Sequence, residues 1–411
     1  MKLEEYLEKR KEITSISRGD IFDKVKEYVG PLYQFMEIGW YPYFKPFERA
    51  EGKVAVLEGR EIKMFGSNNY TGLASDKRVV ESIQKAVEEI GPSATGSRFL
   101  NGNLKIHHEL EGELADFIGK ESALVFATGY QTNVGTISSI LSKNDIAILD
   151  ELDHASIIDG VRLSRAQKVV FKHNDMDDLK RVLEELPVNK GKLILVDGLF
   201  SMEGDIAPVP DIVDLAKKYN ARVLVDEAHS IGVFGPHGEG VVAEFGLTDD
   251  VDIITGTFSK SLSSQGGFTA SNRDVIEFIK HNGRAMIFSA SLTPANTAAA
   301  LTALRIMREE QWRVKKVREN GDYVRDRFRE MGIDVGLSVS PIIPIIIGNP
   351  EKTLFFWQEL LKRGIYVNPV FPPAVPPDRS MLRVSVMATH TKDDLDYLIE
   401  SVREVKKLLF D

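Results

Sequence analysis

An acidic residue and a lysine follow two successive strand-like segments of this chain. The first segment, 222–225, leads into Asp226, and the second, 251–255, leads to Lys260. Ligands of open α/β sheets bind beyond the carboxyl ends of strands, which is where Asp226 stands. A lysine amine can hold an aldehyde as a Schiff base, and a carboxylate beside a pyridine nitrogen keeps that nitrogen protonated so that the ring accepts electrons. Together, in this order, the two residues predict a pyridoxal phosphate site.

Each residue has a simpler interpretation when it is taken alone. An aspartate after Val-Leu-Val is commonly a solvated acid that caps the next turn, and most lysines are surface residues. Two observations favour the site instead. His229 follows Asp226 closely, and Lys260 lies in a run rich in Ser and Thr just before Gly266-Gly267. Hydroxyl groups and backbone amides in such a loop suit a phosphate.

Three further positions could contribute to the same site. Gly129 follows an apolar run and could open a helix whose amides point at a phosphate, although many glycine turns are only turns. His154 lies among acids after another strand-like run, and it is either a surface residue or a neutral imidazole that stacks on a cofactor ring. Arg383 is a charge in an apolar run, and a buried arginine needs a partner such as a substrate carboxylate.

Bulk composition narrows the class of protein. The 411 residues are enough for two or three domains, and 52 basic against 61 acidic residues give a net charge of −9, which argues against nucleic-acid or acidic-membrane partners. Cysteine is absent, so disulfides and thiolate chemistry are excluded. The start resembles neither a secretory signal nor a transit peptide, and the longest apolar run, 341–347, is too short to span a bilayer. We expect a soluble, cytoplasmic protein without a metal site.

From about residue 76 the sequence alternates helix-like and strand-like segments. Apolar residues at helical spacing run over 79–90 and stop at Gly91, and a second helix over 110–118 stops at Gly119. Short apolar runs between helical patterns imply a mostly parallel sheet that is buried on both faces. These runs are 123–126, 146–149, 168–171, 193–196, 223–225 and 253–254.

Changes in residue composition and pattern along the sequence predict three regions. Residues 1–60 predict a helical arm and an aromatic, proline-rich segment that is too apolar to be left in water, so it should pack on the body or on a partner subunit. Residues 61–290 predict a large α/β domain. Residues 291–411 predict a smaller α+β domain, whose last helix begins at a capping box of Thr391 and Asp394.

Other chemistries lack their motifs. The chain has no Gly-x-Gly-x-x-Gly dinucleotide loop and no phosphate-binding Gly-Lys-Ser/Thr sequence. The zinc motif His-Glu-x-x-His and the Gly-x-Ser-x-Gly nucleophile elbow are missing as well. Dinucleotide, nucleotide, zinc-hydrolase and serine-hydrolase functions are therefore disfavoured.

Short motifs occur in one order along the chain: SNNYTGL at 67–73, GSRFLNG at 96–102, DELDHAS at 150–156, DGLFSMEGD at 197–205, DEAHS at 226–230, GTFSK at 256–260 and MATHT at 387–391. In these motifs and in their order the chain resembles the α-oxoamine synthases. This family includes 2-amino-3-ketobutyrate CoA ligase, 8-amino-7-oxononanoate synthase, 5-aminolevulinate synthase and serine palmitoyltransferase. The resemblance runs from about residue 40 to the C-terminus. It implies a fold-type I PLP-dependent transferase with a mostly parallel seven-stranded sheet flanked by helices and a smaller C-terminal α+β domain.

The resemblance also implies roles for individual residues around the cofactor ring. Lys260 would be the Schiff-base lysine and Asp226 the partner of the pyridine nitrogen. His154 would stack on the ring, while His229 and Ser201 would bond its phenolic oxygen.

Other roles concern the phosphate and the substrate. Gly129, Tyr130 and Thr257 would hold the phosphate, with Ser291 supplied by the neighbouring subunit of a homodimer. The amino-acid carboxylate would be held by Asn68 and Arg383. One departure is Thr71, where the family usually has leucine, and it lies outside the reacting groups.

The implied reaction is a decarboxylative condensation by a PLP-dependent C-acyltransferase. Arg383 holds the carboxylate of a small amino acid, and Lys260, displaced by that amino acid, removes the Cα proton. The carbanion attacks an acyl-CoA thioester, and a 2-amino ketone, CoA and carbon dioxide result. Glycine is the first choice of amino acid, as in a glycine C-acetyltransferase, followed by alanine or serine.

Alternatives remain within and outside this family. The surroundings of Lys260 and the segment 373–377 look closest to the serine palmitoyltransferase-like branch. Another fold-type I enzyme, such as an aminotransferase or aldolase, would not release CoA from acyl-CoA. A catalytically silent partner subunit is the non-enzyme alternative, and retention of Lys260, Asp226 and His154 argues against it.

Overall fold

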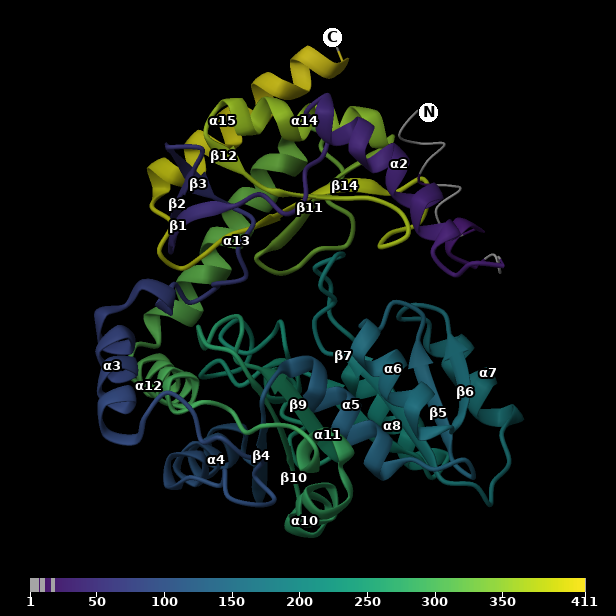
Figure 1. The fold of residues 1–411 in the computed structure, drawn as a ribbon. Helices are drawn as coiled ribbons and strands as arrows, with labels where there is room; N and C mark the ends of the chain where they lie inside the picture. The colour runs from purple at the N-terminus through teal and green to yellow at the C-terminus, as the bar shows by residue number, and fades with distance from the viewer. Residues whose placement is uncertain (1–6, 8–11, 16–18, 411) are drawn as a thin grey trace. The chain divides into compact units, whose positions relative to one another are not determined.

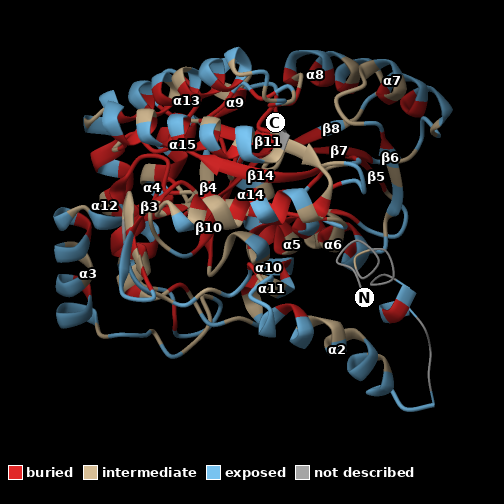
Figure 2. Cartoon of the chain, turned by 90° about the horizontal axis from the view of Figure 1, so that it is seen from above, coloured by how far each residue is buried: buried red, intermediate tan, exposed pale blue. Residues whose placement is uncertain are grey.

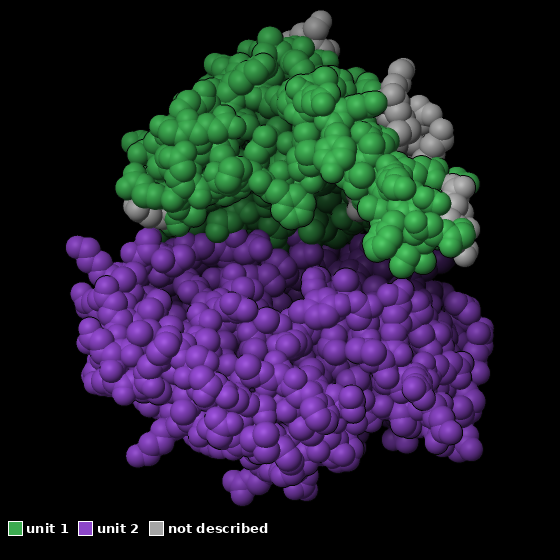
Figure 3. Space-filling view, viewed as in Figure 1, with its two compact units in different colours: residues 1–67, 202–204, 319–411 green, residues 68–201, 205–318 purple. Residues whose placement is uncertain are grey.

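The structure is a computed structural model that describes residues 7, 12–15 and 19–410. The helix predicted for the first ten residues lies almost entirely outside this range. By internal contacts the chain divides into two units (Figure 3): unit 1 comprises residues 1–67, 202–204 and 319–411, and unit 2 comprises 68–201 and 205–318. Among the described residues, none of the helices combines the length and the apolar character needed to cross a lipid bilayer.

The three-region division predicted from the sequence stays a prediction. Unit 2 continues past residue 290 because α12 (Pro294–Glu309) packs against α3 (Lys77–Ile90) and α4 (Lys105–Ile118), which belong to the same unit. The last boundary between the two units along the sequence falls after residue 318, inside α13 (Trp312–Glu330).

Unit 2 is built around a seven-stranded sheet in the order β4-β10-β9-β8-β7-β5-β6 (Figure 1). β10 is antiparallel to both of its neighbours, and the remaining pairs are parallel. The predicted sheet and fold class are confirmed. The strands are β4 (Ser122–Phe126), β5 (Ile146–Asp150), β6 (Gln167–Phe171), β7 (Lys192–Asp197), β8 (Arg222–Asp226), β9 (Ile253–Thr257) and β10 (Gly267–Ser271).

Helices and a short 3-10 turn connect these strands, and most helices begin at a side-chain cap. Asp76, Thr128 and Asn272 each accept a backbone N–H in the first turn that follows them, which satisfies an otherwise unpaired donor. The remaining elements of unit 2 are η1 (Leu73–Ser75), α5 (Gly129–Ile140), α6 (Ala155–Ser164), α7 (Met176–Glu185), α8 (Val209–Lys218), α9 (Val241–Glu244), α10 (Arg273–Asn282) and α11 (Arg284–Ile287).

The central strands are buried on both faces, as the continuous apolar runs predict. Every residue of β5, β7 and β9 is buried, and Figure 2 shows β7 within the buried interior. On one face, Leu149 and Leu195 pack with Ile137 of α5 and Ile157 of α6 in a single apolar cluster. The rigid sheet therefore fixes where each strand ends, and with it the polar residues that follow.

The described residues of unit 1 form two smaller sheets and several helices, and they include part of α13. The sheets have the orders β1-β2-β3-β12 and β11-β14-β13. A core that includes Phe328, Trp357 and Leu398 lies among them. The elements are α2 (Asp23–Glu37), β1 (Phe47–Glu51), β2 (Val54–Leu57), β3 (Arg60–Met64), β11 (Ile342–Gly348), α14 (Pro350–Lys362), β12 (Ile365–Tyr366), β13 (Asn368–Val370), β14 (Ser380–Ser385) and α15 (Lys392–Phe410).

Two details of unit 1 bear on the sequence-based expectations. The capping box at the last helix is confirmed, because the Thr391 backbone N–H donates to the Asp394 carboxylate and the Asp394 N–H donates to the Thr391 hydroxyl. The N-terminal region is not only a helical arm, since it continues into the three antiparallel strands β1 to β3.

Candidate active site

A cavity of about 260 Å³ lies within unit 2 at the carboxyl ends of β8 and β9. Every predicted cofactor-binding residue except Ser291 lines it: Gly129, Tyr130, His154, Ser201, Asp226, His229, Thr257 and Lys260. Its wall also includes polar side chains for which no role was predicted, among them Asn133, Ser156 and Asp197. The structure thus brings the predicted acid and lysine to one pocket.

The carboxylate of Asp226 is held on both oxygens. The side-chain amide of Asn133, on α5, donates to Oδ2 at 2.6 Å, and the Ala228 backbone N–H donates to Oδ1 at 2.9 Å. The amide oxygen of Asn133 in turn accepts from the Thr255 hydroxyl at 2.8 Å. Asp226 is only 4% exposed, so these two donors satisfy a carboxyl group that is shielded from water. The arrangement fixes the direction in which Asp226 faces the cavity.

The same amide leads to His154. The Asn133 amide also donates to the Ser156 hydroxyl at 2.9 Å, and that hydroxyl lies 2.7 Å from Nδ1 of His154. Burial lowers the pKa of His154; the carboxylate of Asp226 opposes this shift and Lys260 adds to it. The net effect of these groups favours the neutral form of the His154 imidazole.

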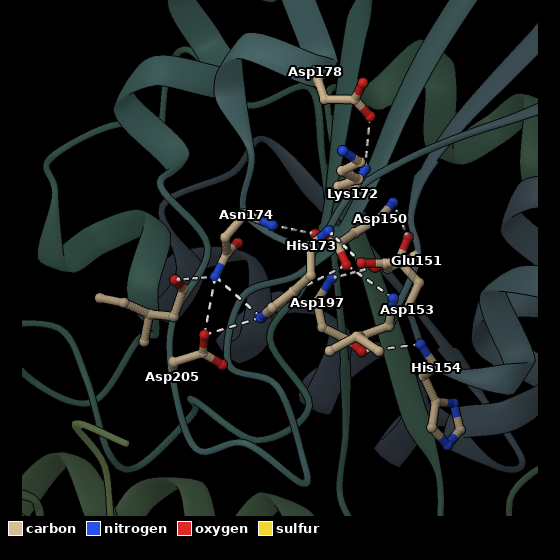
Figure 4. Close-up of polar contacts among 12 residues, drawn as sticks. Asp150, Glu151, Asp153, His154, Lys172, His173, Asn174, Asp178, Asp197 and Asp205 are labelled. Atoms are coloured by element: carbon tan, nitrogen blue, oxygen red, sulfur yellow. Dashed lines mark hydrogen bonds and ion pairs between the residues drawn. The ribbon is translucent and has the colours of Figure 1, made fainter. Parts of the chain in front are cut away.

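A second group of carboxyl groups holds the backbone of His154 (Figure 4). The His154 N–H donates to Asp197 at 3.0 Å, and Asp153 accepts the backbone N–H groups of Asp150 and Asp197 at 3.0 Å each. Burial and the neighbouring carboxylates raise the pKa of Asp153 well above its usual range; burial and the charge of Asp226 raise that of Asp197 in the same way. Because a raised pKa favours the protonated form of a carboxyl group, Asp153 and Asp197 place less negative charge beside Asp226.

The part of the cavity wall formed by the start of α5 and by Thr257 is suited to an anion. α5 begins at Gly129, and a Cβ on this glycine would lie 2.6 Å from the Thr257 hydroxyl, so only glycine permits the approach. The first turn of α5 and the hydroxyls of Thr257 and Ser259, 2.9 Å apart, therefore lie close together. A helix N-terminus with adjacent hydroxyl donors is a common phosphate site.

Tyr130 lines the cavity, but its hydroxyl is engaged elsewhere. It donates to the Asp159 carboxylate, and this hydrogen bond raises the pKa of Tyr130. Any bond from Tyr130 to a phosphate would have to come from its backbone N–H in the first turn of α5.

Lys260 stands in a closed loop between β9 and β10. The Phe258 N–H donates to the Gly266 carbonyl, and the Ser263 N–H donates to the Lys260 carbonyl at 3.0 Å. Thr71, which is fully buried, donates its hydroxyl to the Ser261 carbonyl at 2.6 Å. The departure at Thr71 from the family pattern is therefore a direct contact with the residue after the lysine.

His229 is connected to Asn68 through a tyrosine. The Tyr70 hydroxyl lies 2.8 Å from Nδ1 of His229 and donates to Oδ1 of Asn68 at 3.3 Å. Tyr70 is fully buried. The sequence pointed to Asn68 and His229 but not to the tyrosine between them.

Three predicted residues do not line this cavity: Asn68, whose contact with Tyr70 is given above, Arg383 and Ser291. Arg383 belongs to unit 1, where it is 4% exposed on β14 and donates to the Ser385 hydroxyl at 2.8 Å. Ser291 donates its hydroxyl to the Gly96 carbonyl at 2.9 Å. Its assignment to the site of a neighbouring subunit stays a prediction, as does the role of Arg383.

The residues present fit pyridoxal phosphate. A lysine amine, a firmly held carboxylate, a neutral imidazole and an anion-binding helix N-terminus line one cavity of suitable chemistry. These are the groups that the cofactor's aldehyde, pyridine nitrogen, ring face and phosphate need.

Comparisons with known proteins agree with this geometry. The family model for aminotransferases of class I and II matches residues 60–402. A serine palmitoyltransferase of Sphingobacterium spiritivorum is 46% identical over 392 residues, which cover 95% of this chain and 98% of that enzyme. An 8-amino-7-oxononanoate synthase of Thermosipho melanesiensis is 41% identical over 371 residues, covering 90% and 95%.

Solved structures show the same relationship. A serine palmitoyltransferase from Sphingomonas wittichii has a TM-score of 0.93 at 36% identity, with 95% of this chain and 99% of that chain covered. A high-resolution structure of SPT with PLP has a TM-score of 0.92 at the same identity and coverage. The chain therefore belongs to the aminotransferase class I and II family and is, within it, a pyridoxal phosphate-dependent enzyme of the α-oxoamine synthase group.

Proposed function

We propose that this enzyme condenses L-serine with a long-chain acyl-CoA, releasing CoA and carbon dioxide. The observation that supports the substrates is that relatives named serine palmitoyltransferase match the chain at 46% and 48% identity over 95% of its length. Glycine, the first choice from sequence alone, becomes the less favoured amino acid. The observation that supports the reaction is the single cavity that Lys260, Asp226 and His154 share.

The side chains predicted for the cofactor site have defined parts in this proposal. Pyridoxal phosphate, when bound, supplies an electron sink for the charge that develops at the amino-acid Cα. Asp226, fixed by Asn133 and Ala228, holds a proton at the pyridine nitrogen. The Lys260 amine accepts the Cα proton and can return it later, and its loop keeps it beside the cavity.

Two predicted residues bind the substrate in this proposal. Arg383 and Asn68 hold the serine carboxylate, because a guanidinium in a buried strand pairs well with a planar anion. His229, supported by Tyr70, and Ser201 bond the phenolic oxygen of the cofactor. The protein acts as a homodimer in which Ser291 reaches the phosphate of the neighbouring subunit.

An 8-amino-7-oxononanoate synthase is the second candidate. Relatives of that name are 40% to 43% identical and cover 89% to 94% of the chain. The two candidates share the reaction type and differ in amino acid and acyl group, so one experiment separates them.

The test is a matrix of amino acids against acyl-CoAs, scored by thiol release. Serine, alanine and glycine are each combined with acetyl-, octanoyl- and palmitoyl-CoA, with K260A as the inactive control. We expect the highest rate with serine and palmitoyl-CoA. A maximum with alanine or with a short acyl group overturns the serine assignment, and no amino-acid-dependent CoA release in any combination overturns the reaction itself.

A further inference from the structure

A histidine outside the cavity lies between two carboxylates. His173 follows β6, and its Nδ1 is 3.0 Å from Oδ1 of Asp150 while its Nε2 is 3.0 Å from Oδ2 of Asp205 (Figure 4). An ionised carboxylate only accepts hydrogen bonds, so both ring nitrogens must donate. The geometry therefore describes an imidazolium cation with two anionic partners.

The surroundings of His173 support this charge. Burial opposes it, but the hydrogen bonds to Asp150 and Asp205 outweigh burial and raise the pKa of His173 to about 10. The carboxylate of Glu151 accepts the His173 backbone N–H at 3.0 Å, and the edge-on ring of Phe200 packs at 4.4 Å between centroids. The charged groups that face the ring are thus acidic.

Asn174 adds hydrogen bonds to the junction formed by His173, Asp150 and Asp205. Its backbone N–H donates to Oδ2 of Asp150 at 2.9 Å, and its side-chain amide donates to Oδ2 of Asp205 at 3.1 Å. The other oxygen of Asp205 is buried and has no hydrogen-bond partner among the described residues. The charge of Asp205 consequently depends on His173 for compensation.

One side of this junction leads to His154. The backbone N–H of Asp150 donates to Asp153, which also accepts the N–H of Asp197, and Asp197 accepts the N–H of His154. Each of these distances is 3.0 Å. Asp150 ends β5 and His154 is the N-cap of α6, so this chain of bonds sets the course of the loop between them.

The other side leads to Ser201. The backbone carbonyl of Asp205 accepts the Phe200 N–H at 3.0 Å, and Leu199 and Ile206 form a β-bridge. Ser201 follows Phe200 directly and lines the cavity. Movement of Asp205 would therefore displace residues 199–200 and, with them, Ser201, which follows directly.

We propose that His173 is a positioning residue of the cofactor site: its doubly hydrogen-bonded ring ties together the loops after β5, β6 and β7 and so holds His154 and Ser201 at the cavity. The proposal rests on the cofactor roles given above for those two residues. His173 touches neither cofactor nor substrate in this role, and it acts through Asp150 and Asp205.

The first experiment measures the charge directly. Nitrogen-15 NMR of histidine-labelled protein, with H173Q used to assign the signal, should show both ring nitrogens of His173 protonated at pH 8. A neutral His173 ring with a single protonated nitrogen at that pH overturns the proposal.

The second experiment measures cofactor binding. Apoprotein of wild type, H173Q and the control H281Q is titrated with pyridoxal phosphate and followed by visible absorption. His281 is a largely exposed histidine on α10. We expect about a tenfold higher apparent Kd for H173Q at pH 8, as for the loss of a charged hydrogen-bond partner, and no change for H281Q.

The pH dependence separates positioning from a general loss of stability. His173 gains its partners on folding, so its contribution is complete below pH 6.5 and is lost as the pH rises through about 10. The difference in Kd between wild type and H173Q should therefore shrink between pH 8 and pH 10.5. A lowered melting temperature with an unchanged Kd would mean a purely structural role and overturns the proposal.

Two further measures keep the outcome clear. If H173Q does not fold, D205N removes one anionic partner while leaving the contact to Asp150, and its Kd should rise as well; an unchanged Kd overturns the proposal. Wild-type cofactor binding and CoA release are measured in parallel, so a failure of the proposed function shows in the wild type and not only in the variants.

Discussion

The amide of Asn133 donates to Oδ2 of Asp226 at 2.6 Å, from a helix to the end of a strand that lies far away in the sequence. The same amide group reaches the Ser156 hydroxyl beside His154. A single side chain therefore helps to orient two of the groups that are proposed to contact the cofactor ring, Asp226 and His154.

Replacing Asn133 should weaken cofactor binding more than it weakens the fold. In N133L the carboxylate of Asp226 loses a charge-assisted bond of about 1.5–3 kcal/mol, so the apparent Kd for pyridoxal phosphate should rise at least tenfold. Absorption titration measures this, with the exposed Asn282→Leu on α10 as the matched control. Equal affinities of the two variants would contradict the role of Asn133.

Lys260 should be required for covalent capture of the cofactor but not for folding. We expect K260A to retain the secondary structure and the oligomeric state of the wild type, because the lysine lies in a loop between β9 and β10. It should form no borohydride-reducible adduct, as mass spectrometry of the reduced protein can show. K280A, a lysine change on the exposed side of α10, serves as control. Unchanged turnover by K260A would refute the assignment.

Thr71 gives a test that separates this chain from the usual family pattern. T71V keeps the side-chain volume but leaves the buried Ser261 carbonyl without its hydroxyl donor, which should lower the free energy of unfolding by about 1–3 kcal/mol. Since Ser261 adjoins Lys260, the visible band of the bound cofactor should shift or weaken as well. T71S, which retains the hydroxyl, should behave like wild type; if both variants lose equal stability, the hydrogen bond is not the cause.

Arg383 should act on the amino acid alone. R383A should raise the KM for serine at least tenfold, because it removes the proposed partner of the carboxylate, and should leave the KM for acyl-CoA unchanged. R383K should recover little, since lysine cannot offer the planar pair of donors. An effect confined to acyl-CoA means that the residue has been assigned to the wrong substrate.

His390 makes unit 1 sensitive to acid. Its Nδ1 accepts the Met387 N–H at 3.0 Å, and burial lowers its pKa from 6.5 to about 4. The imidazole of His390 takes up a proton near pH 6.5 in the unfolded chain but only near pH 4 in the folded chain. The contribution of this protonation to the free energy of unfolding is therefore constant above pH 6.5, and the free energy of unfolding decreases as the pH falls from 6.5 toward 4. The loss amounts to about 3 kcal/mol.

Urea unfolding at several pH values between 4 and 7 tests this. H390Q should be less stable than wild type at pH 7 and should lose less stability over the same range. Parallel curves for the two proteins would show that another group carries the acid sensitivity.

The elements that the sequence predicts well are those with a strong local pattern. The helix over 79–90 was predicted to stop at Gly91, and α3 ends at Ile90. The strands β4 to β8 coincide with continuous apolar runs. β10 has the sequence Gly-Phe-Thr-Ala-Ser, which contains no such run and alternates apolar and polar residues over only four positions; it becomes a strand because β4 and β9 pair with it on either side.

The same distinction applies to the site. Asp226 and Lys260 could be predicted because each follows its own strand, and a strand end is visible in the sequence. Asn133 and His173 could not be predicted, because their partners lie in other elements and only the folded sheet brings them within hydrogen-bond distance. A single Asn in a helix or a single His after a strand carries no local signal of such a contact.

The antiparallel course of β10 limits how the lysine can move. The chain leaves β9 at Thr257 and re-enters the neighbouring strand at Gly267, and the Phe258 N–H bond to the Gly266 carbonyl closes the loop at its base. A backbone anchored on both sides cannot swing, so the amine travels between its positions only by rotation of its own methylene chain. The distance that the Lys260 amine can reach from its Cα is therefore set by the length of the lysine side chain. We expect that a side chain shorter by one methylene, or a residue inserted into 258–266, would move the amine away from the position where it reacts.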